Sequence, residues 1–232
     1  MNELVEDRIT ICIPHWQVQK LMSPCLRSIR KHSNKYDIEV IVVDNGSKDQ
    51  SLDYLKSLKW IKLIERPEET NANWPQNVFT AWDCGIKQAT GQYFMTMHSD
   101  VFIKEDDWLD PYLEYIQEND KVAAAGTWKL NLESPIYAFQ KQFFGVIGTF
   151  LKRLFGKKNR YNLKKGHYPR DFCALYKTEE ILGNDITFRP LGHGGGGYSP
   201  AKQLWEKGFQ TKMIPVRIIY DKIFHVAHAT AA

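Results

Sequence analysis

The stretch I-E-V-I-V-V-D-N-G-S, residues Ile38–Ser47, joins a β-branched run to strong turn chemistry. It predicts a buried strand with Asp44 at its carboxyl end. An earlier apolar run, Ile9–Ile13, is closed by Pro14 and predicts another strand. Between the two runs, Gln17–His32 has apolar residues at helical spacing. This strand–helix–strand order predicts an α/β fold with a mostly parallel sheet.

The alternation continues along the chain, less regularly in its second half. The further strands that we expect are Trp60–Ile64, Tyr93–Met97, Val122–Ala125, Phe172–Tyr176, Met213–Ile219 and Ile223–Val226. The further helices that we expect are Ser51–Leu58, Asn77–Ala89, Asp106–Gln117, Thr178–Leu182 and Pro200–Lys207. Neither a repeat nor a linker-like stretch interrupts the pattern. We therefore expect one domain over residues 1–232, with halves at about 8–130 and 171–232 separated by a basic, apolar insert at about 134–170.

Composition narrows the class of protein. The chain has 232 residues, 43% hydrophobic and 25% charged, which excludes collagen-like and wholly disordered proteins. A net charge of +4 gives no indication of nucleic-acid binding. The four cysteines are far apart in the sequence, so a zinc ribbon or redox motif is not expected. The first residues do not resemble a signal peptide and no apolar run could span a membrane, so we expect a cytoplasmic protein.

Two expected strand ends carry acids. Asp44 opens a D-N-G-S turn, which is explained equally well as a plain Asx turn. Asp100 follows His98 by two residues, so that on an extended chain both side chains point the same way. A carboxylate and an imidazole so placed can share a divalent cation, or Asp100 can simply cap the strand end.

The motifs taken together resemble a family 2 glycosyltransferase of the GT-A fold, a Rossmann-like nucleotide-binding sheet flanked by helices. The pieces that carry the resemblance, in order, are I-T-I-C-I-P (Ile9–Pro14), I-V-V-D-N-G-S (Ile41–Ser47), N-x-x-x-A-x-x-x-G-I-x-x-A-x-G-x-Y (Asn77–Tyr93), M-H-S-D (Met97–Asp100), F-C-A-L-Y (Phe172–Tyr176), E-K-G-F (Glu206–Phe209) and F-H-V-A-H (Phe224–His228). The resemblance covers most of the chain except the basic insert.

The resemblance implies transfer of a sugar from a nucleotide-diphosphate donor, with a UDP-sugar as the expected donor, to a glycan or lipid-linked acceptor with inversion. A divalent metal, Mn²⁺ or Mg²⁺, would neutralise the diphosphate as the sugar leaves. Its implied ligands are Asp100 with His98, and His225 or His228. The implied donor-binding residues are Pro14, His15, Asp44, Asn45, Ser47, Asn77 and Ser99. Asp44 would accept a hydrogen bond from the base or the ribose.

The sequence departs from the family pattern at two places. His98 replaces the first acid of the usual D-x-D, which favours a softer metal such as Mn²⁺ over Mg²⁺. The acid pair expected about a dozen residues before Gly208 is replaced by Gly196 and Gly197, so the usual general base is missing. The candidates to replace it are His193, Asp185 and Asp171.

Two rival functions stay open at this point. One is a non-catalytic protein that binds a nucleotide sugar or glycan, which the missing base favours. The other is a nucleotidyltransferase, although the turn after Pro14 lacks the expected glycines and basic residues. Residues 134–170 contain nine Lys or Arg and no acid, and 143–158 has apolar residues at helical spacing. This segment predicts either a packed helix or peripheral contact with the inner face of a membrane.

Overall fold

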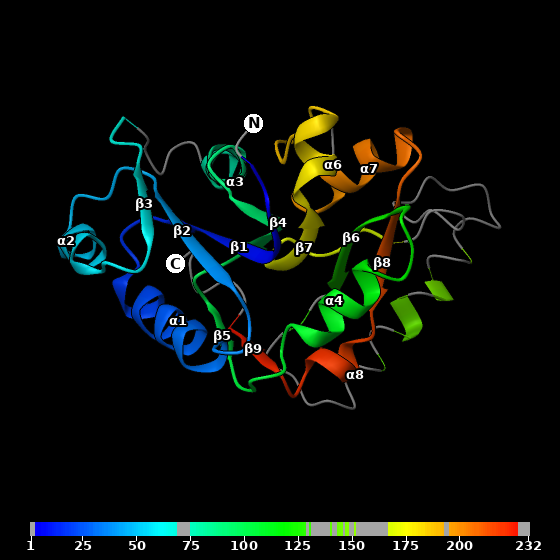
Figure 1. The fold of residues 1–232 in the computed structure, drawn as a ribbon, viewed down its shortest axis with the longest axis horizontal. Helices are drawn as coiled ribbons and strands as arrows, with labels where there is room; N and C mark the ends of the chain where they lie inside the picture. Colours follow the sequence, from blue (N-terminus) through cyan, green and yellow to red (C-terminus); the bar gives the residue numbers. More distant parts are fainter. Residues whose placement is uncertain are drawn as a thin grey trace.

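The computed structural model describes residues 3–68, 75–128, 130, 140, 143–145, 147–148, 151, 167–192 and 195–226. Its main sheet has seven strands in the order β3-β2-β1-β4-β7-β6-β8 (Figure 1). These strands are β1 (Val5–His15), β2 (Ile38–Asp44), β3 (Lys62–Glu65), β4 (Gly91–Met97), β6 (Val122–Thr127), β7 (Cys173–Lys177) and β8 (Gln210–Ile214). Only the pairs made by β7, with β4 and with β6, are antiparallel. The predicted mostly parallel α/β sheet is confirmed.

Side-chain alternation along the strands divides the core into two layers. On β1, Ile9, Ile11 and Ile13 pack into one buried cluster, whereas Cys12 packs into the other. Successive strand residues point to opposite faces of a sheet, so an uninterrupted apolar run needs cover on both faces. The β-branched runs in the sequence therefore specify a central sheet between two layers of helices.

Helices cover both faces of the sheet (Figure 1). The helices that contribute to the first cluster are α1 (Gln19–His32), α2 (Gln50–Ser57), α4 (Asp110–Ile116) and α8 (Val216–Ile219). Those that contribute to the second cluster are α3 (Gln76–Ile86), α6 (Thr178–Gly183) and α7 (Tyr198–Glu206). All the helices predicted from apolar spacing are present, with ends shifted by a few residues.

One predicted strand is wrong and one element was missed. The strand expected over Met213–Ile219 ends at Ile214, because Pro215 has no N–H to continue the ladder, and residues 216–219 form α8. A short strand, β5 (Val101–Ile103), was not predicted. It pairs with β9 (Ile223–His225) in a separate two-stranded sheet. Strand β9 confirms the strand expected at Ile223–Val226.

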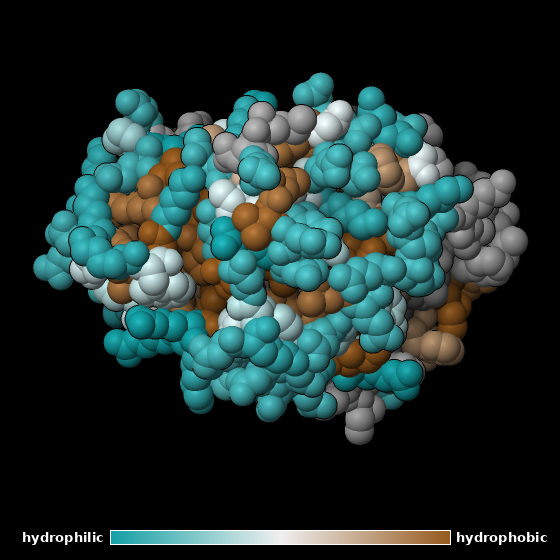
Figure 2. Space-filling view, in the orientation of Figure 1, coloured by the Kyte–Doolittle hydropathy of each residue, from teal (hydrophilic) through white to brown (hydrophobic). Residues whose placement is uncertain are grey.

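The surface in Figure 2 is mostly hydrophilic, and hydrophobic residues show mainly in hollows between polar side chains. The described part of the basic insert is small, and its exposed side chains include Phe143, Phe144 and Leu151. Hydrophobic residues also show at the edge of Figure 2 where Figure 1 draws that segment. Within the described residues, none of the helices has both the length and the apolar character needed to cross a bilayer.

Candidate functional site

The turn between β4 and β5 carries His98 and Asp100. From the sequence we expected an extended chain here. Instead the chain turns, because the amide of Val101 donates to the carbonyl of His98 (3.3 Å). The turn still brings the two side chains together, with 3.9 Å between His98 Nδ1 and Asp100 Oδ1. The amide of His98 donates to the carbonyl of Phe172 (2.9 Å), which fixes the turn to the chain entering β7.

Strand β9 brings His225 to the same carboxylate. Its pairing with β5 places His225 opposite Val101, and His225 Nε2 lies 3.5 Å from Asp100 Oδ1. The Nδ1 of His225 donates to the carbonyl of Leu130 (2.7 Å), so Nε2 of the neutral ring carries the lone pair. Phe172 stacks on the imidazole with centroids 4.2 Å apart, which fixes the plane of the ring.

His98, Asp100 and His225 form a compact cluster whose nearest ligand atoms all lie within 4.8 Å of one another. Asp100 is 1% exposed, and neither carboxylate oxygen has a hydrogen-bond partner among the described residues. Burial alone would raise the pKa of Asp100, but His225 and His98 beside it, when protonated, hold that pKa below its ordinary value. Burial lowers the pKa of His98, which keeps its ring neutral. This donor set fits a divalent cation.

A cavity of about 170 Å³ opens beside the cluster, at the carboxyl ends of β1, β2 and β4. Ligands of open α/β sheets bind at this end of the strands. The residues that line it are Pro14, His15, Trp16, Val18, Asn45, Pro75, Asn77, Val78, Phe79, His98, Ser99 and Asp171. Of the predicted donor-binding residues, the structure therefore places Pro14, His15, Asn45, Asn77 and Ser99 in the lining, whereas Asp44 and Ser47 are outside it.

His15 presents a hydrogen-bond acceptor that the sequence did not reveal. Its Nε2 lies 2.8 Å from Ser51 Oγ, whose own hydroxyl donates to the carboxylate of Asp49. Ser51 must then accept from Nε2–H, which leaves Nδ1 with a lone pair. Burial lowers the pKa of His15, so the neutral form prevails, and Nδ1 has no partner among the described residues.

Asp44 and Asn45, at the end of β2, are both buried. Asp44 Oδ2 accepts hydrogen bonds from the amides of Gly46 (3.1 Å) and Ser47 (3.0 Å), so the Asx turn is present. The other oxygen, Oδ1, is buried and has no partner within the described part of the chain. Arg66 Nη1 donates to Asn45 Oδ1 (2.6 Å), which orients the amide group of Asn45. Ser47 lies outside the cavity lining, and its hydroxyl accepts from the amide of Gln17 (3.0 Å).

The three candidates for the missing base differ in their placement. Asp171 lines the cavity next to His98 and Ser99. Asp185 is exposed, follows α6, and is absent from the lining. His193 lies outside the described residues, as does the metal-ligand candidate His228. Of the described candidates, only Asp171 is in position to meet a ligand in the cavity.

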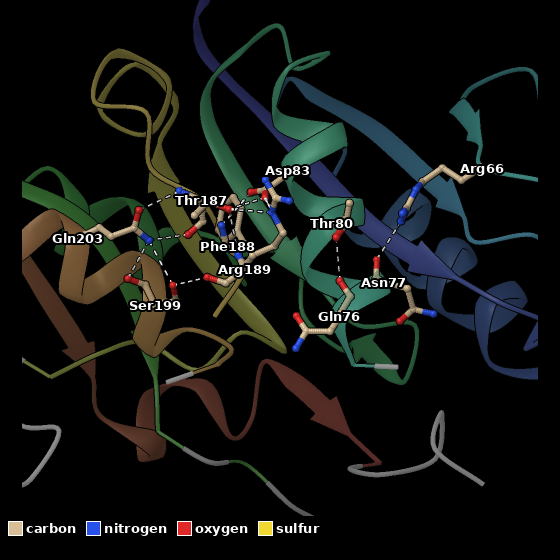
Figure 3. Close-up of polar contacts among 10 residues, drawn as sticks. All are labelled: Arg66, Gln76, Asn77, Thr80, Asp83, Thr187, Phe188, Arg189, Ser199 and Gln203. Carbon is tan, nitrogen blue, oxygen red and sulfur yellow. Dashed lines mark hydrogen bonds and ion pairs between the residues drawn. The ribbon is translucent and has the colours of Figure 1, made fainter. Parts of the chain in front are cut away.

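A polar network behind the cavity was not predicted. On α3, Asp83 accepts hydrogen bonds from the amide of Phe188 (2.8 Å), the hydroxyl of Thr187 (2.5 Å) and Arg189 Nε (3.0 Å) (Figure 3). On α7, Gln203 Nε2 donates to the carbonyl of Thr187 (2.7 Å). The segment 187–189 is thereby fixed between two helices. Because the contacts of Asp83 join residues about a hundred positions apart, no local pattern indicates them.

The fold is that of the GT-A class, as two similar solved structures show. One similar solved structure is the mannosyltransferase PcManGT from Pyrobaculum calidifontis, in complex with GDP-Man and Mn²⁺; its TM-score is 0.64 at 17% identity, over 93% of this chain and 57% of that one. Another is S. aureus TarS in complex with UDP-GlcNAc, with a TM-score of 0.58 at 19% identity, over 90% of this chain and 56% of that one.

The chain belongs to glycosyl transferase family 2, whose family model matches residues 10–181. It is 27% identical over 179 residues to glycosyltransferase GlyA of Streptococcus pneumoniae, covering 77% of this chain and 23% of that protein. It is 32% identical over 128 residues to the poly(ribitol-phosphate) beta-glucosyltransferase of Bacillus spizizenii, covering 53% of this chain and 19% of that protein. The chain thus spans a quarter or less of the length of these two relatives.

Proposed function

We propose that this protein transfers a sugar from a nucleoside-diphosphate donor to a hydroxyl of a glycan or lipid-linked acceptor, with inversion and with the help of a divalent metal. The observation that carries the proposal is the buried His98–Asp100–His225 cluster at the edge of the cavity. An unpaired buried carboxylate is costly unless a cation or a hydrogen-bond donor reaches it. The complexes of similar structures with GDP-Man and UDP-GlcNAc support a nucleotide-sugar donor.

Different residues of the site would bind the metal and the nucleoside. Asp100, His98 Nδ1 and His225 Nε2 would hold the metal, and the Leu130 carbonyl keeps the His225 lone pair directed at the site. A bound metal would supply Lewis-acid stabilisation of the negative charge that grows on the leaving diphosphate. With two imidazoles and one carboxylate as ligands, Mn²⁺ is preferred to the harder Mg²⁺.

The carboxyl ends of β1 and β2 would bind the nucleoside. His15 Nδ1, in the cavity lining, and Asp44 Oδ1, outside that lining, are both acceptors, at positions paired in the β1–β2 ladder. Their partners would be N–H or O–H donors, such as a base N–H or a ribose hydroxyl. Trp16 supplies an aromatic surface in the cavity lining, suited to stacking against a base. UDP is the first donor nucleotide to test, and GDP the second.

The test is a thermal-shift titration with UDP and GDP, each in Mn²⁺, in Mg²⁺ and in EDTA. A ligand that binds only the native state raises the melting temperature by mass action. We expect stabilisation by a nucleotide with Mn²⁺, and its loss in Asp100→Asn. Asp221→Asn, which removes an exposed acid, serves as the matched control. A response that does not depend on metal, or that Asp100→Asn leaves intact, contradicts the metal assignment.

We further propose that the segment 143–158 contacts a membrane surface. Phe143 and Phe144 are 53% and 67% exposed, and the sequence that follows carries Lys152, Arg153, Lys157 and Lys158, which lie outside the described residues. Apolar burial and attraction to anionic lipid would add, at about 1 kcal/mol per basic residue. We expect cosedimentation with phosphatidylserine-containing vesicles at low salt and less with neutral vesicles.

Replacing those four basic residues by Gln should abolish the cosedimentation while nucleotide binding persists. The control replaces Lys20, Arg27, Arg30 and Lys31 of α1 by Gln, which removes the same charge from another surface. Equal loss in both variants would show that only net charge matters, and sedimentation unchanged by the first set would contradict the proposal.

A further inference from the structure

Transfer of a sugar to a hydroxyl requires a base, because the acceptor oxygen must lose its proton as it bonds to carbon. This need follows from the proposed function and rests on it. Two of the nearby acids are already engaged: Asp100 belongs to the cluster, and Asp44 holds the amides of Gly46 and Ser47. Among the described residues that line the cavity, Asp171 is the one acid.

The antiparallel pairing of β7 with β4 determines the position of Asp171. Cys173 is the register partner of Met97, and the amide of His98 donates to the carbonyl of Phe172. Asp171 is the next residue beyond Phe172, and it lines the cavity together with His98 and Ser99. It is only partly buried, so its carboxylate can meet a molecule that enters from solvent.

Two glycines leave room for this carboxylate. Gly196 has φ +60°, and a Cβ there would lie 2.5 Å from Asp171 Oδ2. A Cβ on Gly197 would overlap the carbonyl oxygen of Pro169. Only a backbone without side chains can pass so close to residues 169–171. The acid pair expected at these two positions would occupy the volume that Asp171 and its backbone fill.

The glycine backbone is itself held in place. The amide of Ser199 donates to the carbonyl of Gly196 (3.2 Å), and the Ser199 hydroxyl donates to the carbonyl of Arg189 (2.5 Å). Arg189 in turn is bound to Asp83 of α3 (Figure 3). The wall behind Asp171 is thus tied to two helices, which restricts where the carboxylate can move.

We propose that Asp171 is the general base of the transfer reaction. Its carboxylate takes the proton of the acceptor hydroxyl while that oxygen forms a bond to the anomeric carbon of the donor. The bond from that carbon to the diphosphate oxygen breaks, and its electron pair leaves with the nucleoside diphosphate. The proton passes from Asp171 to solvent afterwards. The family pattern predicts this acid at residues 196–197, just before α7. In this proposal it comes instead from the chain preceding β7.

The test measures release of nucleoside diphosphate from UDP-glucose and from GDP-mannose with Mn²⁺, water serving as acceptor, in parallel with the thermal shift. General-base catalysis typically contributes about 10²–10⁴-fold. We expect Asp171→Asn to lower turnover at least about 100-fold while metal-dependent nucleotide binding is retained. Asp185→Asn should leave both properties unchanged.

A glycine pair supplies a second comparison. Gly196 and Gly192 both have positive φ, but a Cβ on Gly192 meets nothing within 4 Å. Gly196→Ala should therefore displace the Asp171 carboxylate and lower turnover about tenfold or more, whereas Gly192→Ala carries only the backbone strain. Equal effects of the two substitutions would contradict the role given to Asp171.

The outcomes separate this inference from the proposed function. Failure of the unaltered chain to bind either nucleotide with metal counts against the proposed function. Turnover that Asp171→Asn does not change counts against Asp171 alone, as does loss of nucleotide binding in that variant. Binding without turnover by the unaltered chain overturns the assignment and favours a protein that binds nucleotide sugars without catalysis.

Discussion

The indole ring of Trp82 lies nearly parallel to the imidazole of His98, with centroids 5.7 Å apart and planes 14° apart. Trp82 is fully buried on α3, and its Nε1–H donates to the carbonyl of Cys12 (3.2 Å). The indole therefore has a fixed position in the core and sets the plane of the imidazole. His98 Nδ1 is thereby kept on the side of Asp100.

The metal preference should depend on residue 98. An imidazole favours Mn²⁺ over the harder Mg²⁺, whereas a carboxylate suits both ions. We expect His98→Asp to increase the thermal shift with UDP and Mg²⁺ relative to that with UDP and Mn²⁺. His32→Gln, outside the cavity, is the control. An unchanged ratio between the two metals would show that residue 98 does not contact the ion.

Substitutions of Asp44 should separate a turn from a nucleotide contact. Asp44→Ala leaves the amides of Gly46 and Ser47 without their acceptor, so the free energy of unfolding should fall by about 1–3 kcal/mol. Asp44→Asn keeps one oxygen for the turn and should retain more stability.

Calorimetric titration with UDP tests whether Asp44 also contacts the nucleotide. If Oδ1 accepts from the nucleoside, Asp44→Asn should weaken binding by about 1–3 kcal/mol while urea unfolding changes less than in Asp44→Ala. Unchanged affinity for UDP in Asp44→Asn would show that Asp44 stabilises the turn and does not contact the nucleotide.

His167 should make stability depend on pH. Burial lowers its pKa from 6.5 to about 4. Between these values the unfolded chain binds a proton that the native protein does not, so the free energy of unfolding falls as pH is lowered from 6.5 to 4. The loss amounts to about 3 kcal/mol. Urea unfolding at several pH values should show a flatter dependence in His167→Gln. A slope equal to that of the parent would contradict this assignment.

Contact between α3 and β1 depends on Gly85. A Cβ there would overlap Cys12 Sγ, which is fully buried. We expect Gly85→Ala to lower the free energy of unfolding by about 1–3 kcal/mol and to cost less in a Cys12→Ala background. Gly183→Ala is the control, since nothing lies within 4 Å of its added methyl group. Equal costs in both backgrounds would contradict the contact.

Much of the sheet could be predicted because short stretches of sequence specify most of its strands. The β-branched runs that end at Pro14 and Asp44 specify buried strands, and the apolar spacing between them specifies α1. Pro215 was the local signal that should have ended the strand expected over Met213–Ile219. The antiparallel insertion of β7 between β4 and β6 depends instead on long-range pairing, which no local pattern records.

The candidate site was predicted in part for the same reason. His98 and Asp100 are two residues apart in the sequence, so their spacing could predict that the two side chains lie close together. The Leu130 carbonyl that orients His225, and the space that Gly196 leaves for Asp171, arise only when distant segments meet. Residue types alone indicated that the usual acid pair was missing, and they left three candidates for the base: His193, Asp185 and Asp171.

The pairing of β5 with β9 also gives the site an order in time. His98 and Asp100 leave the ribosome long before Ile223–His225, and the third residue of the cluster, His225, arrives only when β9 pairs with β5. A nascent chain that ends before β9 contains the residues lining the cavity but only two of the three cluster residues. Any metal binding that needs all three residues must therefore wait for the pairing of β5 with β9, which marks the point in synthesis at which the cluster becomes complete.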